Sequence, residues 1–242
     1  MIIVSIFLSL IFIVIGFIIT EKNAKYLLSG YNTMSEEDRK HFDLTAYLNY
    51  FRKFHIFLGI SLLITSLILY YFVDADYSGI FADVYPIAAY LYFIWKGKRF
   101  TNMKDSQNKS SFIFAVVIMS TVLISIIAMF TYTLQDNIIE IKEDIVQING
   151  IYGMDIPVID IKSIELVEEL PEITLKINGF ALETIEKGLF KTSDDEKVKL
   201  LINSQKNPII FITTKTNEKI YYSSKEKSNQ EIYHQLIQVL KK

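Results

Sequence analysis

The sequence predicts an α+β membrane protein in which four transmembrane helices precede a small β-barrel that ends in one helix. Two observations lead to this prediction. The first half contains four long apolar runs, and about 20 apolar residues suffice to cross a bilayer as a helix. The second half contains short apolar runs separated by turn residues, which is typical of strands, and closes with an amphipathic helical pattern.

The composition limits the classes of function. Hydrophobic residues make up 51% of the chain and concentrate in its first half, as expected for a segment in lipid. The chain has no cysteine, which excludes disulfides, zinc fingers, iron–sulfur clusters and thiol catalysis. The net charge is -2, and because nucleic-acid binding needs a basic face, no nucleic-acid partner is expected.

The predicted transmembrane domain covers residues 1–135. Its spans lie at about 2–20, 56–73, 79–95 and 111–133. No basic residue precedes the first run and no Ala-x-Ala cleavage site follows it, so we interpret it as a retained span rather than a signal peptide. The third run has the weakest pattern because it contains Asp83 and Pro86.

A distinctive polar segment lies between the first two spans. It contains four consecutive residues that form a candidate motif: Gly30, Tyr31, Asn32 and Thr33. Thr33 and Ser35 each precede an acidic residue by three positions, which is the spacing of a capping box and predicts the start of a helix. Aromatic and basic residues then mix, which favours an amphipathic interfacial helix over about 36–53.

Both candidate sites of this domain have a structural and a functional interpretation. The Gly30–Thr33 motif either binds a partner at the cytoplasmic face or forms the turn that starts the helix, and we favour the turn. Asp83 is an ionisable group inside a predicted span, and such groups are costly in lipid and usually functional. Because Asp83 lies near the outer end of the span, we favour a carboxylate at headgroup level.

The basic residues predict a topology. Six Lys or Arg residues lie between the first and second spans and five between the third and fourth, whereas none precedes the first span or separates the second from the third. The positive-inside rule then places both basic loops in the cytoplasm, and the amino terminus and the second domain outside. Abundant Ile, Lys and Asn and scarce Pro indicate an AT-rich bacterial genome, so the membrane is expected to be a bacterial cell membrane. A cytoplasmic second domain is the alternative.

The predicted second domain covers residues 138–242 and contains about seven short strands. Asn178-Gly179 follows an apolar run and is a strong hairpin signal. Ser228 and Glu231 form a capping box ahead of an apolar helical face. Antiparallel strands followed by a helix that plugs one end are the order of a pleckstrin-homology (PH) type barrel, although lipocalin-like and other barrels also carry terminal helices.

Two sets of residues resemble known bacterial proteins. The segment Gly30-Tyr31-Asn32-Thr33-Met34-Ser35-Glu36-Glu37 resembles a family of small integral membrane proteins of unknown function. Four segments are similar to the bacterial PH-like domains attached to such proteins: Leu170-Pro171, Ile177-Asn178-Gly179-Phe180, Lys187-Gly188-Leu189-Phe190 and Asn207-Pro208-Ile209-Ile210. The resemblance implies a PH-like architecture and no particular reaction.

The sequence predicts no catalytic, cofactor-binding or metal-binding site. The three histidines, His41, His55 and His234, lack metal-ligand spacing, and neither a Gly-rich phosphate loop nor a Ser/His/Asp arrangement occurs. From Asp136 onward, 14 Lys oppose 18 Asp and Glu, which leaves a formal charge of -4. This balance disfavours lipid headgroups as ligands and favours a protein or peptide partner.

The remaining candidate motif is Asn178, Gly179 and Phe180. Its aromatic ring either packs in the core of the domain or forms a contact surface, and we favour the core. The sequence thus predicts a non-enzymatic membrane protein, open to homo-oligomer formation, that presents a PH-like interaction domain at the surface of the lipid bilayer. The alternative is a small transporter or sensor that uses Asp83.

Overall fold

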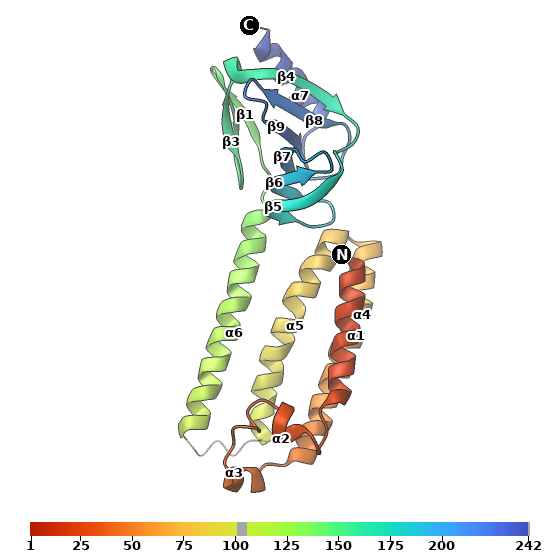
Figure 1. The fold of residues 1–242 in the computed structure, drawn as a ribbon, viewed down its shortest axis with the longest axis vertical. Coiled ribbons are helices and arrows are strands. Elements are labelled where there is room, and N and C mark those ends of the chain that lie inside the picture. The colour runs from red at the N-terminus through yellow and green to blue at the C-terminus, as the bar shows by residue number, and fades with distance from the viewer. Residues whose placement is uncertain (101–105, 242) are drawn as a thin grey trace. The chain divides into compact units, whose positions relative to one another are not determined.

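The structure is a computed structural model that describes residues 1–100 and 106–241. The chain divides into two compact units, Met1–Ala128 and Met129–Lys242. The first unit is helical, and the second combines two β-sheets with one helix (Figure 1). The predicted α+β class is therefore confirmed.

Three long helices pack together in the first unit: α1 (Ile2–Ile18), α4 (Leu44–Phe72) and α5 (Ala75–Gly97). Helix α4 contacts both α1 and α5. Their shared core includes Phe12 of α1, Leu58 and Leu62 of α4, and Ala82 and Phe93 of α5. The short elements of this unit are α2 (Ala24–Leu27), α3 (Glu36–Lys40) and the 3-10 helix η1 (Lys98–Phe100).

The connection from α3 to α4 differs from the sequence prediction. In place of an interfacial helix over about 36–53 and a separate span over about 56–73, α4 is one continuous helix. The Asp43 carboxylate accepts a hydrogen bond from the Ala46 amide at 3.0 Å and so caps this helix at its start. No glycine or proline lies between Leu44 and Leu58, and nothing in the sequence ends the helix before it enters the apolar run.

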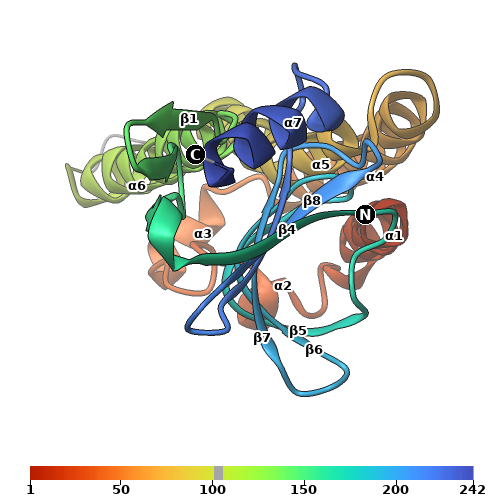
Figure 2. The ribbon, with the colours of Figure 1, turned by 90° about the horizontal axis from the view of Figure 1, so that it is seen from above.

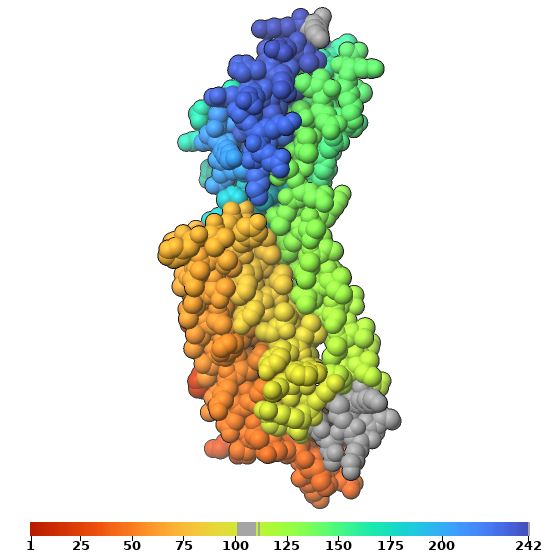
Figure 3. All heavy atoms as spheres, turned by 180° about the vertical axis from the view of Figure 1, so that it is seen from behind, coloured from red at the N-terminus to blue at the C-terminus, as the bar shows by residue number. Residues whose placement is uncertain are grey.

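Within the described ranges, two helical segments are long and apolar enough to cross a membrane, Leu44–Phe72 and Phe112–Thr133. The second belongs to α6 (Ser106–Thr133), part of which lies at the surface in the view of Figure 3. Exposed apolar residues on it are Ile113, Phe114, Val117, Ile118, Val122, Ile124, Ile127 and Met129. Helix α1 is apolar but has 17 residues, and α5 carries Asp83 and Pro86, so membrane crossing by these two stays a prediction.

The second unit contains two sheets. The three-stranded sheet is antiparallel and has the order β1-β2-β3, with β1 (Ile139–Lys142), β2 (Ile145–Ile148) and β3 (Met154–Pro157). The six-stranded sheet has the order β4-β8-β9-β7-β6-β5. Its strands are β4 (Ile161–Val167), β5 (Ile173–Ala181), β6 (Glu186–Thr192), β7 (Lys197–Ile202), β8 (Ile209–Thr214) and β9 (Lys219–Ser223). The 3-10 helix η2 (Val158–Asp160) joins the sheets.

A single closed barrel of antiparallel strands does not form among the described residues. The strands make two open sheets, and β7 pairs in parallel with β9. The sequence prediction missed this pair because local patterns indicate only hairpins between strands that follow each other in the chain. Here β8 does not pair with β7, and β9 lies between the two strands in the sheet. The six-stranded sheet is nevertheless curled (Figure 2). Residues 168–172 connect its two edge strands, β4 and β5, and a fully extended link of this length spans about 20 Å. Six flat strands would place these edges about 24 Å apart, which is farther than the link can reach.

Each face of the six-stranded sheet covers a core. One core lies between this sheet, the three-stranded sheet and α7 (Asn229–Leu240), and includes Val146, Ile156, Ile164, Leu201, Ile212, Tyr222 and Leu236. The other core includes Phe190, Val198, Leu200, Ile202 and Ile209. Successive residues of β7 point to opposite faces, so this one strand serves both cores. The predicted C-terminal helix is confirmed, and it packs against β4 and β8.

Candidate functional site

The Gly30–Thr33 motif forms a turn that Arg39 holds in place. The Thr33 hydroxyl donates to the Gly30 carbonyl at 3.1 Å, and Gly30 has a φ of 87°, which glycine adopts without strain. The Arg39 guanidinium donates to the Tyr31 carbonyl at 3.1 Å and to the Asn32 carbonyl at 2.9 Å, and it lies 5.5 Å from the centre of the Tyr31 ring. These contacts give the motif a structural role, and ligand binding by it stays a prediction.

The helix that follows this turn starts at the second of the two capping candidates. The Ser35 hydroxyl accepts from the Asp38 amide at 3.1 Å and donates to the Asp38 carboxylate at 2.7 Å. Thr33 instead closes the turn. The sequence therefore located the helix start, but it did not indicate that Arg39 would fold back onto the motif.

Asp83 is exposed on α5, whereas its neighbour Ala82 is buried against α1 and α4. Two ionisable side chains that the described part of the helical unit buries are Asp76 of α5 and His55 of α4, and His55 is 1% exposed. Its Nδ1 lies 2.8 Å from the Phe51 carbonyl and its Nε2 2.8 Å from the Tyr90 hydroxyl. A neutral His55 donates through Nδ1 and accepts from Tyr90, so both ring nitrogens are satisfied.

The hairpin turn predicted at Asn178-Gly179 is wrong. These residues and Phe180 lie inside β5, and the turn follows at residues 182–185, where the Leu182 amide donates to the Ile185 carbonyl at 2.9 Å. Gly179 pairs across the ladder with Gly188, and a side chain on Gly179 would come within 2.5 Å of a backbone oxygen. The glycine thus serves a close approach of two strands rather than a turn.

The other two residues of this motif differ in burial: Asn178 is exposed and Phe180 is half-buried. Phe180 is half-buried and packs edge-on against Phe130, with 6.0 Å between ring centres. Asn178 is exposed and accepts a hydrogen bond from the Tyr152 hydroxyl at 3.2 Å. The three residues therefore do not gather into one site.

The residues after α6 are built into the second unit by buried hydrogen bonds. The Asn137 amide donates to Asn203 Oδ1 at 2.9 Å, and its carbonyl accepts from the Tyr222 hydroxyl at 2.9 Å. Its side chain donates to the Asn149 carbonyl at 2.9 Å and the Ile151 carbonyl at 2.8 Å. The sequence pattern predicts that the second domain starts at residue 138, and this prediction omits the residue that ties the start of the domain to three separate segments.

Lys187 is a second feature that sequence analysis missed. This side chain is fully buried in β6, and its ammonium donates to the Gln135 carbonyl at 2.5 Å. Burial lowers the pKa of Lys187 to about 8, although the Asp136 carboxylate opposes this shift. Nothing in the local sequence Glu186-Lys187-Gly188 distinguishes a buried lysine from an exposed one.

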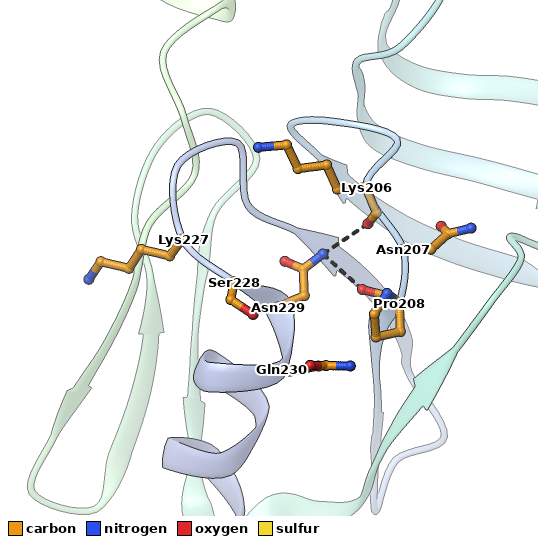
Figure 4. A pocket seen from close by; sticks show the side chains of 7 residues that line it. All are labelled: Lys206, Asn207, Pro208, Lys227, Ser228, Asn229 and Gln230. Atoms are coloured by element: carbon orange, nitrogen blue, oxygen red, sulfur yellow. Dashed lines mark hydrogen bonds between the residues drawn. The ribbon is translucent and has the colours of Figure 1, made fainter.

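One pocket of the second unit, of about 390 Å³, lies where α7 begins (Figure 4). The Asn229 side chain lines this pocket and donates to the Lys206 carbonyl at 3.0 Å and to the Pro208 carbonyl at 2.8 Å. Its side-chain oxygen accepts from the Ser224 amide. The Lys206 ammonium donates to the Lys225 carbonyl at 2.8 Å, and in Figure 4 it ends well apart from that of Lys227. The polar groups therefore join chain segments rather than converge on a ligand.

A second pocket, of about 360 Å³, is here named the lysine pocket. Its lining residues are Met154, Leu189, Lys197, Lys199, Asn217, Glu218, Lys219 and Ile220. Leu189, Lys199 and Ile220 are register neighbours on β6, β7 and β9, so they form one row across the sheet. Sequence analysis missed this pocket because the parallel pairing of β7 with β9 brings its residues together.

Comparison with known protein families finds a match in the first part of the chain. Residues 6–101 match the model of a family described as a domain of unknown function (DUF3784). The match runs from α1 to the end of α5 and includes the Gly30–Thr33 motif and Asp83. It fits the uncharacterised membrane family that the sequence resembles, and the second unit lies outside it. No curated protein and no solved structure matches the chain.

Proposed function

We propose that the chain is a non-enzymatic integral membrane protein that holds a β-rich binding unit at the outer surface of the bilayer. The observation that carries this proposal is the junction after α6. A segment with an exposed apolar surface is followed within a few residues by Asn137, which is buried and hydrogen-bonded in the second unit. A unit joined in this way is held at a short distance from the membrane.

The proposal includes four crossings by α1, α4, α5 and α6. Consecutive helices would cross in opposite directions, and this brings both basic loops to one side of the bilayer, in agreement with the positive-inside rule. The second unit then lies on the other side. Its sheets and its packed C-terminal helix support a role like that of PH-like domains, although the sheets are open.

The binding surface that we propose is the free edge of β5. This nine-residue strand pairs with β6 alone in the described part of the chain. Leu175 and Ile177 are two residues apart, and they are 56% and 41% exposed. An edge strand with unpaired backbone groups and apolar side chains is suited to an extended peptide of a partner protein, which would add as a further strand.

Single-cysteine labelling tests the topology cleanly because the chain has no cysteine of its own. Glu169→Cys lies in the exposed link between β4 and β5, and Lys25→Cys lies exposed after α1. We expect a membrane-impermeant maleimide to label Glu169→Cys in intact cells and Lys25→Cys only after permeabilisation. The reverse pattern would place the second unit in the cytoplasm.

Partner binding is tested with Leu175→Glu in the full chain. Ile159→Glu is the matched control because Ile159 is 75% exposed but lies in η2, away from the free edge of β5. After cross-linking in membranes, we expect a protein adduct that Leu175→Glu abolishes and Ile159→Glu retains. An adduct that survives Leu175→Glu would reject the edge of β5 as the binding surface.

The alternative function, a transporter or sensor that uses Asp83, has one observation in its favour. The Asp83 side chain is exposed on a helix that we propose to lie in the membrane. A carboxylate there needs a polar neighbour or water, which a substrate pathway would supply.

A further inference from the structure

We propose that the lysine pocket binds a small amphiphilic anion, with a carboxylate or phosphate head and a short apolar body. The site lies between β3 and the parallel strands β7 and β9. It is independent of the edge of β5, and it requires no membrane topology. Three observations lead to the proposal: the position of Lys199, the charge of the lining, and the apolar floor.

Lys199 places an ammonium group in the cavity without a charged partner. Its side chain is half-buried, and it lies between Leu189 of β6 and Ile220 of β9 in the row across the sheet. The hydrogen-bond partner of its Nζ is Met154 Sδ at 3.5 Å, and a thioether is a weak acceptor. Among the described residues no carboxylate forms an ion pair with Lys199. An anion in the cavity would replace the poor acceptor by a strong one.

The lining is positive although the unit as a whole is acidic. Lys197 and Lys199 lie two residues apart on β7, so both point to the same face of the sheet. Lys219 also lines the cavity, but it pairs with Glu196 and contributes less to the local field. Glu218 is the single carboxylate of the lining. Neither Lys197 nor Lys199 forms an ion pair within the described part of the chain, and two such lysines in one concave site attract a negative group.

The remaining surface determines the class of ligand. Met154, Leu189 and Ile220 supply an apolar floor, and the volume of about 360 Å³ is at the lower end of small-molecule sites. A bare inorganic anion would leave this floor uncovered. A short acid that combines an anionic head with an alkyl body would contact both the ammonium of Lys199 and the floor.

The test uses the full chain in uncharged detergent and four probes: hexanoate, butyl phosphate, acetate and the neutral hexanamide. Lysine acetylation is followed residue by residue by mass spectrometry. We expect hexanoate and butyl phosphate to slow acetylation of Lys199 several-fold and acetate to act only at much higher concentration. Lys162 is exposed on β4 and should react at an unchanged rate. Equal protection by hexanamide, or equal slowing at Lys162, would overturn the proposal.

Lys199→Met tests the same site by titration calorimetry with hexanoate, because methionine retains most of the aliphatic stem without the charge. We expect affinity to fall about tenfold or more, the scale of a lost charge-assisted hydrogen bond, and Lys162→Met to bind as the unmodified chain does. Equal binding by both variants would reject Lys199 as the anchor. The acetylation pattern of the unmodified chain decides the question if Lys199→Met fails to fold.

Discussion

Lys187 combines complete burial with a charged group, and its surroundings explain how the fold tolerates it. Its ammonium donates to the Gln135 carbonyl, near the end of α6, and the Asp136 carboxylate lies close enough to favour the charged form. Lysines near the C-terminal end of a helix also interact favourably with its dipole. One side chain therefore joins strand β6 to the segment that leaves α6.

We expect Lys187→Met to lower the free energy of unfolding of the second unit by about 1–3 kcal/mol. Methionine fills a similar volume, but it removes the charged donor of the hydrogen bond to the Gln135 carbonyl. Denaturant unfolding followed by circular dichroism measures the loss. Lys162→Met, at an exposed position of β4, is the control and should change the stability little.

The stability of the second unit should also depend on pH through Lys187. Burial lowers its pKa to about 8, whereas an unfolded lysine has a pKa of about 10.4. Between these values the unfolded chain holds a proton that the folded chain has released, so the free energy of unfolding rises with pH. We expect the stability of the unmodified chain minus that of Lys187→Met to increase from pH 8 to pH 10. A constant difference would contradict the assignment.

At the scale of elements, α1 and α4 approach closely because small residues face each other. Ser5 and Ser9 of α1 are fully buried, and the Ser9 hydroxyl donates to the Ser5 carbonyl at 2.7 Å. A Cβ atom on Gly59 of α4 would come within 2.6 Å of both Ile13 Cγ1 and the Ser9 carbonyl oxygen. Small residues at such contacts let helix backbones pack closely in membranes.

We expect Gly59→Ala to destabilise the helical unit by about 1–3 kcal/mol, since the added methyl group overpacks the contact with α1. Gly97→Ala is the matched control because the nearest atom to its added carbon would be 4.0 Å away. Thermal unfolding of the purified chain in detergent should show a lower midpoint for Gly59→Ala alone. Equal unfolding midpoints for the two variants would contradict this prediction, since they would show that α1 and α4 accommodate the added methyl group without loss of stability.

At the scale of the whole molecule, the boundary of the second unit lies before Asn137 rather than after it. We expect a fragment of residues 134–242 to fold and a fragment of residues 139–242 to be less stable. The shorter one lacks the hydrogen bonds of Asn137 to Asn203, Asn149 and Tyr222, and also the Gln135 carbonyl that accepts from Lys187. Amide dispersion in nuclear magnetic resonance spectra and urea unfolding compare the two. Equal stability would show that neither the Asn137 network nor the bond between Lys187 and Gln135 stabilises the unit.

Asp83→Asn separates the two proposed functions of the full chain. If the protein is a binding protein, we expect this variant to restore every phenotype of a deletion strain, since the side chain is exposed outside the helical core. Asp83→Glu, which keeps the charge, is the control. Loss of complementation by Asp83→Asn but not by Asp83→Glu would favour the transporter or sensor.

Prediction from sequence succeeded where the signal was local and periodic. The start of α3 after one of the two candidates Thr33 and Ser35, the start of α7 after Ser228 and the apolar run of α6 were located from local patterns. It failed where one dipeptide has two uses: Asn178-Gly179 normally favours a turn, but here it allows β5 and β6 to approach. It also failed for Lys187 and Lys199, because burial depends on which strands become neighbours.

The sequence by itself determined that the first half is helical and apolar, that the second half is built of strands, and that one helix ends the chain. These properties follow from periodicity and composition along a continuous segment. Only the tertiary structure decided that the strands form two open sheets, that Asn137 belongs to the second unit, and that Lys199 lines a cavity. Each of these depends on contacts between residues far apart in the chain, and no local pattern encodes which distant segments will pair.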